Sequence, residues 1–188
     1  MLATAWLAIT VLAAGGDTTR GPVRAVAEVD LEQYAGRWFE IARLPNSFQK
    51  DCAGETTADY VLLPDRQIRV VNSCVRPDGS INRAEGRARL AKADGPTSKL
   101  KVRFAPGFLS FLPLVWGDYW ILDLTDDYGA VLVGEPSRKY LWILARSPEL
   151  DDVTYRRLVS TAVAQGFDVT RLLRSPTAGE QTREVVRQ

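Results

Sequence analysis

The feature that most constrains this chain is a succession of short β-like runs between residues 37 and 146, separated by turn-forming residues. Runs of this length, rich in β-forming residues and alternating in polarity, predict half-buried β-strands. Because most of the connections are short, consecutive strands are expected to pair as antiparallel neighbours. The pattern therefore predicts an all-β fold, an eight-stranded antiparallel up-and-down β-barrel. The strands are expected at residues 37–44, 55–63, 67–74, 83–91, 99–105, 118–125, 129–135 and 140–146.

Helical segments are predicted before the first strand and after the last strand. Asp30 can cap a short helical turn that Gly36 ends. After residue 146 the apolar period changes from two to about 3.6, and Gly166 supplies a stop signal. This C-terminal α-helix is expected to pack on the outside of the barrel. Its apolar stripe consists of Tyr155, Leu158, Val159, Ala162 and Val163.

The chain divides into four segments. Residues 1–16 hold an apolar run of signal-peptide length followed by small residues, which predicts export; a buried N-terminal helix is the alternative. We interpret residues 17–29 as a linker, 30–175 as the folded domain and 176–188 as a flexible polar tail. Gly16 stands where a lipidated bacterial protein would carry cysteine, so a lipid anchor at this position is not expected.

Composition excludes several classes of function. The chain contains no histidine, which removes catalytic triads, histidine metal sites and axial haem histidines together. Its 24 basic and 23 acidic residues nearly cancel, which argues against nucleic acid as a partner. We therefore expect a binding protein and not an enzyme, with no metal and no cofactor. The candidate acid clusters, none paired towards the interior, consist of Asp123, Asp126, Asp127 and Glu135.

Three separated segments resemble the signature of the lipocalin family. Gly36-Arg37-Trp38 begins the first predicted strand, Thr125-Asp126-Asp127-Tyr128 follows the sixth, and Arg146 ends the eighth. The resemblance covers residues 29–174 and is strongest to bacterial outer-membrane lipocalins of the Blc type and to apolipoprotein D. It implies that Arg146 packs over the Trp38 ring at the closed end of the barrel. By this resemblance, the structural signature consists of Gly36, Trp38, Asp126, Tyr128 and Arg146.

Alternation along the strands assigns side chains to the interior. With Arg146 inward, Trp142 and Leu144 also face inward, and the residues between them face the helix. On the sixth strand, Tyr119 and Ile121 are preferred to Trp120 as inward residues. The alternative is that the inward side chains simply fill a solid core. The expected ligand-binding residues are Phe48, Tyr60, Asn72, Phe104, Tyr119 and Trp142.

Two features lie at the predicted open end. Residues 105–116 form a long apolar connection, and three interpretations stay open: a lid over the ligand, a homodimer contact, or a tip that dips into a membrane. Cys52 and Cys74 lie near this end on adjacent strands, so a disulfide is predicted, with two independent thiols as the alternative. The residues singled out in the connection are Phe108, Leu109, Phe111 and Trp116.

The leading hypothesis is binding and transport or storage of an amphipathic or hydrophobic lipid. Fatty acids and lysophospholipids are the expected ligand classes, because an apolar interior with few polar points suits them. The protein is expected to be exported to the periplasm or to associate with the outer membrane. A structural or partner-binding role in the cell envelope is the alternative, and the apolar connection keeps it open.

Overall fold

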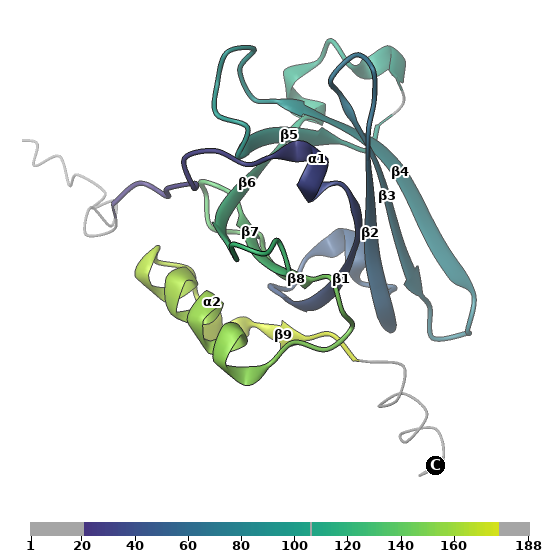
Figure 1. Cartoon of the computed structure of the whole chain (residues 1–188). Coiled ribbons are helices and arrows are strands. Elements are labelled where there is room, and N and C mark those ends of the chain that lie inside the picture. The colour runs from purple at the N-terminus through teal and green to yellow at the C-terminus, as the bar shows by residue number, and fades with distance from the viewer. Residues whose placement is uncertain (1–20, 106, 177–188) are drawn as a thin grey trace, which may run out of the picture.

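The computed structural model describes residues 21–105 and 107–176, in which eight strands form a closed antiparallel barrel (Figure 1). Each strand pairs with its neighbours in sequence, and the barrel closes because β1 pairs with β8 as well as with β2. The predicted eight-stranded barrel is confirmed, with strand ends within two residues of expectation. The strands are β1 (Gly36–Arg43), β2 (Gly54–Leu62), β3 (Ile68–Val75), β4 (Ile81–Leu90), β5 (Lys99–Arg103), β6 (Gly117–Leu124), β7 (Ala130–Gly134) and β8 (Leu141–Ala145).

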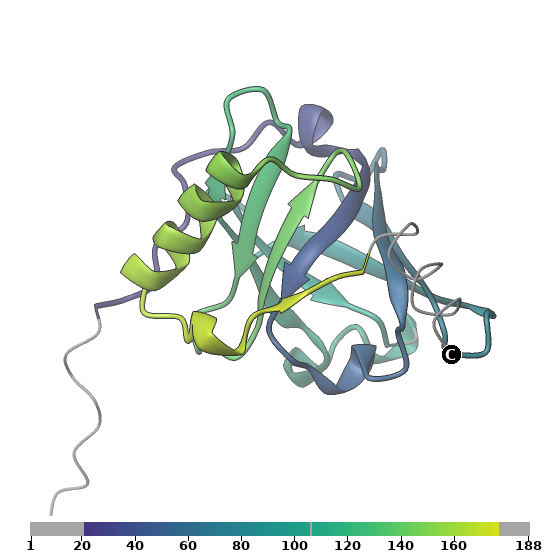
Figure 2. The same ribbon diagram turned by 90° about the horizontal axis from the view of Figure 1, so that it is seen from below.

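A ninth strand, β9 (Leu173–Arg174), was not predicted, and it pairs with the second half of β1. The main helix, α2 (Asp152–Ala164), lies on the outside of the barrel as expected (Figure 2). The remaining elements are short and lie in the connections. They are α1 (Leu31–Tyr34), η1 (Ser47–Gln49), η2 (Gly107–Leu109), η3 (Pro113–Val115) and η4 (Val169–Arg171).

The N-terminal part of the domain is more ordered than the sequence indicates. Asp30 caps α1 as predicted, since its carboxylate accepts the backbone N–H groups of the next turn. The described part of the expected linker, however, lies against the barrel: Val23 and Val29 are buried, and the N–H of Val26 donates to the carbonyl of Ile121. The signal-peptide prediction and Gly16 lie outside the described residues, as do residues 177–188 of the expected tail.

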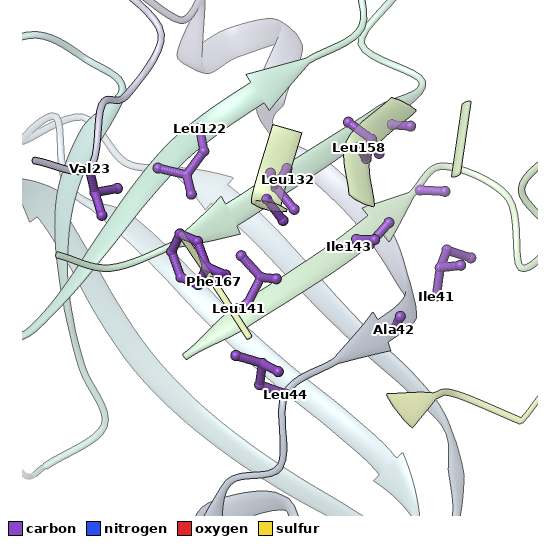
Figure 3. Close-up of a cluster of buried hydrophobic side chains, with 13 residues drawn as sticks. Val23, Ile41, Ala42, Leu44, Leu122, Leu132, Leu141, Ile143, Leu158 and Phe167 are labelled. Atoms are coloured by element: carbon purple, nitrogen blue, oxygen red, sulfur yellow. The ribbon is translucent and has the colours of Figure 1, made fainter. Parts of the chain in front are cut away.

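The interface between α2 and the outer surface of the barrel is a continuous apolar core (Figure 3). Leu158 of α2 is fully buried against the outer faces of β7 and β8, which contribute Leu132 and Ile143. Gly134 lets Phe167 approach this wall, since a Cβ at Gly134 would lie 2.8 Å from the ring of Phe167. This core explains the helical spacing of Tyr155, Leu158, Val159 and Ala162, because only one side of α2 is covered. Val163, the fifth residue of the predicted stripe, is 54% exposed and lies outside the core.

Strand β1 changes partners halfway along its length. Its first half pairs with β2, whereas its second half pairs with β8 and β9. Ile41 is an extra residue in the pairing with β8, where Glu40 lies opposite Leu144 and Ala42 lies opposite Ile143. A bulge of this kind bends a strand and changes which side chains share a face.

Among the described residues, no helix has the length and apolar character needed to cross a bilayer.

Candidate ligand-binding site in the barrel interior

The closed end of the barrel is sealed by Trp38 and Arg146. Trp38 is fully buried, and the guanidinium of Arg146 lies 3.9 Å from the centre of its ring. The same guanidinium donates to carbonyls at the C-terminal end of α1, which have no partner within so short a helix. These contacts make the closed end a structural floor. The acceptors at the end of α1 are the carbonyls of Gln33 at 2.6 Å, Tyr34 at 3.1 Å and Ala35 at 2.9 Å. The guanidinium also donates to the carbonyls of Arg37 at 2.9 Å and Tyr128 at 3.4 Å.

The turn after β6 also belongs to this floor. The hydroxyl of Tyr128 accepts the N–H of Asp30 at 2.9 Å, which ties the turn to the start of α1. Asp127 accepts the N–H of Gly129, whereas Asp126 is exposed and makes no hydrogen bond with the described residues. The turn is therefore held by Asp127 and Tyr128, and Asp126 contributes no contact.

The assignments of inward and outward side chains agree with the structure. Leu144 joins the interior cluster, whereas Leu141 and Ile143 pack outside under α2. Tyr119 and Ile121 face the interior, and Trp120 packs against the outer core. The further predicted inward residues in or against the interior cluster are Ala58, Tyr60, Leu62, Ile68, Val70, Leu100, Val102 and Trp142.

The interior differs between its two halves. Near the floor the inward side chains are buried, as Val70 and Val131 illustrate. Towards the mouth, Asn72 and Trp142 are half-buried, and Ala84, the residue opposite Asn72, is exposed although it faces inward. Because these side chains point into the barrel, solvent reaches them through the mouth.

The middle of strand β4 carries small inward residues. These are Ala84, Gly86 and Ala88, whereas Leu90 at the end of the strand packs against the interior cluster. The ring of Phe104 occupies the position over Gly86, where a Cβ would lie 2.7 Å from Phe104 Cδ1. Phe104 itself is 43% exposed. The middle of β4 therefore contributes little side-chain volume to the interior, and the ring of Phe104 covers Gly86.

Three tyrosine hydroxyls meet inside the barrel. The hydroxyl of Tyr119 lies 2.7 Å from that of Tyr34 and 3.0 Å from that of Tyr60. Removal from water raises the pKa of Tyr60 to about 12 and raises the pKa values of Tyr34 and Tyr119 well above the ordinary value. The hydroxyls therefore stay protonated at neutral pH and provide a neutral polar point in an apolar surrounding.

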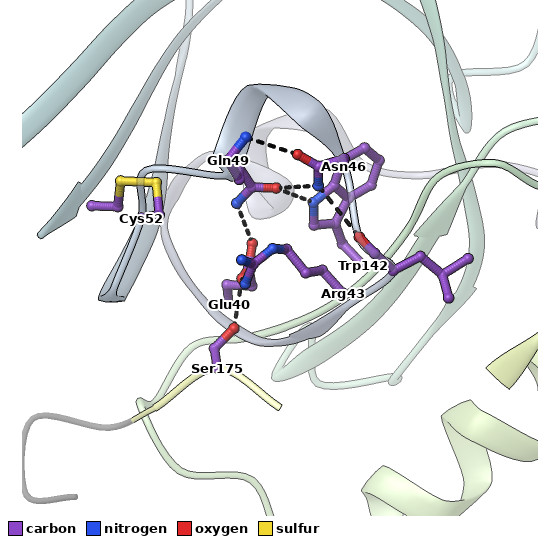
Figure 4. Close-up of polar contacts among 9 residues, drawn as sticks. Glu40, Arg43, Asn46, Gln49, Cys52, Trp142 and Ser175 are labelled. Carbon is purple, nitrogen blue, oxygen red and sulfur yellow. Dashed lines mark hydrogen bonds and ion pairs between the residues drawn. A yellow bond between two sulfur atoms is a disulfide. The ribbon is translucent and has the colours of Figure 1, made fainter. Parts of the chain in front are cut away.

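A second polar group, which the sequence did not predict, lies at the mouth (Figure 4). We call it the mouth cluster: Glu40, Arg43, Asn46, Gln49 and Trp142. The bulge at Ile41 places Glu40 and Arg43 on the same face, opposite the inward residues Leu144 and Trp142. Arg43 Nη1 donates to Glu40 at 2.9 Å, and these side chains are only 13% and 2% exposed.

Hydrogen bonds connect the rest of the mouth cluster. Gln49 Nε2 donates to Glu40 at 2.6 Å, and Gln49 Oε1 accepts from Trp142 Nε1 at 3.0 Å and from Asn46 at 2.7 Å. Ser175, which follows β9, donates to Glu40 from outside the cluster. Two buried atoms, Arg43 Nε and Asn72 Oδ1, have no hydrogen-bond partner among the described residues. Their hydrogen-bonding capacity is therefore unused among the described residues.

Phe48 lies at the rim of the mouth and not inside the barrel. It is 57% exposed, and its ring centre lies 5.4 Å from that of Tyr140 and 6.1 Å from that of Trp142. The prediction that Phe48 lies in the interior is therefore wrong, because Phe48 belongs to η1, which lies beyond the end of β1.

The predicted disulfide is confirmed. Cys52 and Cys74 are bonded, with their Cα atoms 5.6 Å apart. The bond ties the connection between β1 and β2, which carries Asn46, Phe48 and Gln49, to β3. It therefore holds one side of the mouth in place.

The apolar connection is attached to the outer wall of the barrel. Trp116 is buried, with the guanidinium of Arg89 4.2 Å and that of Arg103 5.1 Å from its ring centre. Both arginines face outward, because neighbouring residues of β4 and β5 face the interior. Leu109 is half-buried and Phe111 is 76% exposed; the side chain of Phe108 lies outside the described part. The contact with Trp116 fixes the end of the connection beside β4 and β5.

The candidate acid residues have structural partners outside the interior. Asp123 accepts hydrogen bonds from Arg157 and Thr161 of α2, and Glu135 accepts them from its own connection. The described residues contain no group of three or more acidic or cysteine side chains arranged to hold a metal ion.

Comparison with known proteins agrees with this architecture. Residues 29–177 match the family model of the lipocalin-like domain. The chain is 41% identical over 160 residues to temperature-induced lipocalin-1 of Arabidopsis thaliana, a match that covers 85% of each protein. It is 34% identical over 175 residues to the outer membrane lipoprotein Blc of Escherichia coli K12, covering 92% of this chain and 93% of Blc.

Other relatives and solved structures agree. Apolipoprotein D of Rattus norvegicus is 34% identical over 180 residues, covering 86% of this chain and 89% of that protein. The structure of insecticyanin from Manduca sexta superposes with a TM-score of 0.65 at 24% identity, covering 84% of this chain and 86% of that one. The match over most of the chain shows that this protein belongs to the lipocalin family, whose barrels bind small hydrophobic ligands.

Proposed function

We propose that the protein binds an amphipathic lipid, of the fatty acid or lysophospholipid class, inside the barrel and transports or stores it in the cell envelope. The observation that carries this proposal is the solvent-reachable half of the interior, which combines apolar walls with the mouth cluster. The ligand-binding residues proposed there are Asn72, Phe104, Tyr119 and Trp142, with Tyr60 deeper and Phe48 at the rim.

The apolar walls supply the affinity in this proposal. An acyl chain of about 15 buried methylenes gains on the order of 12 kcal/mol before the costs of association. Micromolar binding therefore needs no strong polar anchor. Small side chains on β4 and the ring of Phe104 suit a flexible chain, which can follow an irregular space.

The mouth cluster supplies the orientation. The free N–H of Arg43 Nε suits a carboxylate or phosphate oxygen, and Glu40 already balances the charge of Arg43. An ionised headgroup at the mouth would receive a charged hydrogen bond without entering the apolar interior. The acyl chain would then point towards the three tyrosines.

A location in the cell envelope is proposed on two grounds. Residues 1–16 have the pattern of a signal peptide, and Blc is named an outer membrane lipoprotein in Escherichia coli and in Vibrio cholerae. Gly16 stands at the position of the lipidated cysteine, so we propose export to the periplasm or outer membrane without an anchor at this residue. We propose a binding role and no catalysis.

A matched pair of substitutions on β4 tests the proposal. Ala84→Phe places a ring in the interior. Glu85→Phe, at the next residue of the strand, places the same ring on the outer face of the barrel. Displacement of a fluorescent fatty acid should weaken about tenfold in the first variant and stay within about twofold in the second, since a tenfold change corresponds to two lost methylene contacts. Native mass spectrometry after purification, with organic extraction, would identify the lipid. Recovery of no lipid together with no displacement would refute the proposal.

A further inference from the structure

One outer wall of the barrel carries a concentrated positive charge. The strand pairing sets Arg69, Arg87 and Arg103 directly opposite one another on three neighbouring strands, and sets Arg89 opposite Lys101 in the next row. All five lie on the outer side of the sheet, because the residues beside them, such as Ala88 and Leu100, belong to the interior. Arg103 is nevertheless buried, with its guanidinium over the ring of Trp116. We call these five residues the arginine face.

The arginine face is poorly neutralised. Lys101 pairs with Asp118 at 2.9 Å. Arg103 is buried, packs on Trp116 and donates to the carbonyl of Ala105 at 2.7 Å, so the charge offered to a partner comes from the other arginines. Arg69, Arg87 and Arg89 make no ion pair and donate no side-chain hydrogen bond among the described residues. Like charges directly opposite each other on neighbouring strands destabilise a sheet. The whole chain carries a net charge of only +1, so this face is a local concentration and not a general basicity.

The apolar connection lies beside the arginine face. Trp116 is held between Arg89 and Arg103, which fixes the end of the connection to this wall. Its tip is strongly exposed: Phe111 is 76% and Leu114 is 96% exposed. Figures 1 and 2 show that α2 and the wall of β3 and β4 lie on opposite sides of the barrel. Cationic and apolar groups therefore meet on the side away from α2.

We propose that the arginine face and the tip of the connection together dock on the surface of an anionic phospholipid bilayer. Guanidinium groups bind phosphate oxygens bidentately, and neighbouring anionic lipids would neutralise the unpaired arginines. Apolar side chains at the tip would enter the interface between headgroups and acyl chains. A second copy of the chain suits this face poorly, because two arginine faces would repel each other.

This docking is distinct from lipid binding inside the barrel, since none of its residues faces the interior. It nevertheless brings the mouth, where the connection begins, close to a source of lipid. Among the three interpretations of the apolar connection, the proposal favours the membrane.

Vesicle flotation with the full chain tests the proposal. The vesicles are phosphatidylcholine alone or phosphatidylcholine mixed with phosphatidylglycerol. The double variant Arg69→Gln, Arg87→Gln removes two unpaired charges from the face. The matched control, Arg156→Gln with Arg171→Gln, removes two exposed charges from the helix side of the barrel. Fluorescent fatty acid displacement checks that every variant is folded and that the interior is intact.

We expect binding to the mixed vesicles that high salt weakens, because salt screens exposed charges. The variant on the arginine face should bind about 25-fold more weakly, at roughly fivefold for each arginine. The control should bind like the original chain. Phe111→Ser with Leu114→Ser should weaken binding to the same vesicles. Equal binding to both kinds of vesicle, equal loss in both arginine variants, or no binding at all would overturn the proposal. Dimerisation lost in the Phe111 and Leu114 variant, without vesicle binding, would assign the tip to a second copy instead.

Discussion

Arg146→Ala tests the closed end of the barrel. The change removes a guanidinium 3.9 Å from the centre of the Trp38 ring together with its five hydrogen bonds to backbone carbonyls, three of them at the end of α1. The cation–π contact accounts for about 1–2 kcal/mol. The hydrogen bonds add about 2 kcal/mol in total, because water can reach the freed carbonyls at this half-buried position. We expect the free energy of unfolding to fall by about 3–4 kcal/mol.

Arg146→Lys is the matched control for this prediction. Lysine keeps the positive charge over Trp38 but has one nitrogen in place of the planar fork, so we expect a loss of about 1–2 kcal/mol. Urea unfolding followed by tryptophan fluorescence, with the disulfide kept oxidised, measures both variants. Lipid affinity of the folded variants should be unchanged, since the floor does not face the mouth. A loss below about 1 kcal/mol for the alanine variant would refute the role assigned to Arg146.

Three further predictions concern stability. Reduction of the Cys52–Cys74 bond, which spans a sequence separation of 22, should lower the free energy of unfolding by about 3 kcal/mol; an unchanged melting temperature with reductant would contradict this. Because the pKa of Tyr60 is about 12 in the folded protein and about 10 in an unfolded chain, its contribution is complete below pH of about 10 and falls by about 1.4 kcal/mol per pH unit up to about 12. In alkaline urea titrations Tyr60→Phe should flatten that decline. Gly134→Ala should cost about 1–3 kcal/mol, because the new methyl would meet Leu122 at 2.7 Å and Phe167 at 2.8 Å; calorimetry that finds no loss would show that these side chains move aside freely.

The barrel could be predicted from the sequence because each strand has one face towards the interior and one away from it. Leu144 and Ile143 were assigned to opposite faces by alternation alone, and the structure agrees. Gly36, Trp38 and Arg146 could be placed together because antiparallel strands return to the same end at every second turn. These inferences rest on local periodicity and on short connections.

The mouth cluster could not be predicted in this way. Glu40 and Arg43 are three residues apart, so strict alternation assigns them to opposite faces of β1. The extra residue at Ile41 returns both to the interior, and its position depends on pairing with β8 and β9. Strand β9 contains two residues, which is too short for any periodic signal. Both features depend on contacts between distant segments.

The position of Trp116 could not be predicted from the sequence either. An apolar connection at the mouth is compatible with a lid, and only the pairing of β4 with β5 sets Arg89 and Arg103 around the indole on the outer wall. Trp116, which sets the orientation of the connection, is therefore held by Arg89 of β4 and Arg103 of β5.

The three tyrosines inside the barrel have a consequence for proton order. Three O–H groups joined by two hydrogen bonds leave one proton without an acceptor among themselves. If the chain of donors runs from Tyr34 to Tyr60, the spare proton is at Tyr60; if it runs the other way, the spare proton is at Tyr34. Reversal requires only rotation of hydroxyl hydrogens and moves no ring. The same interior can therefore present a hydrogen-bond donor or an acceptor at one place without any movement of its walls.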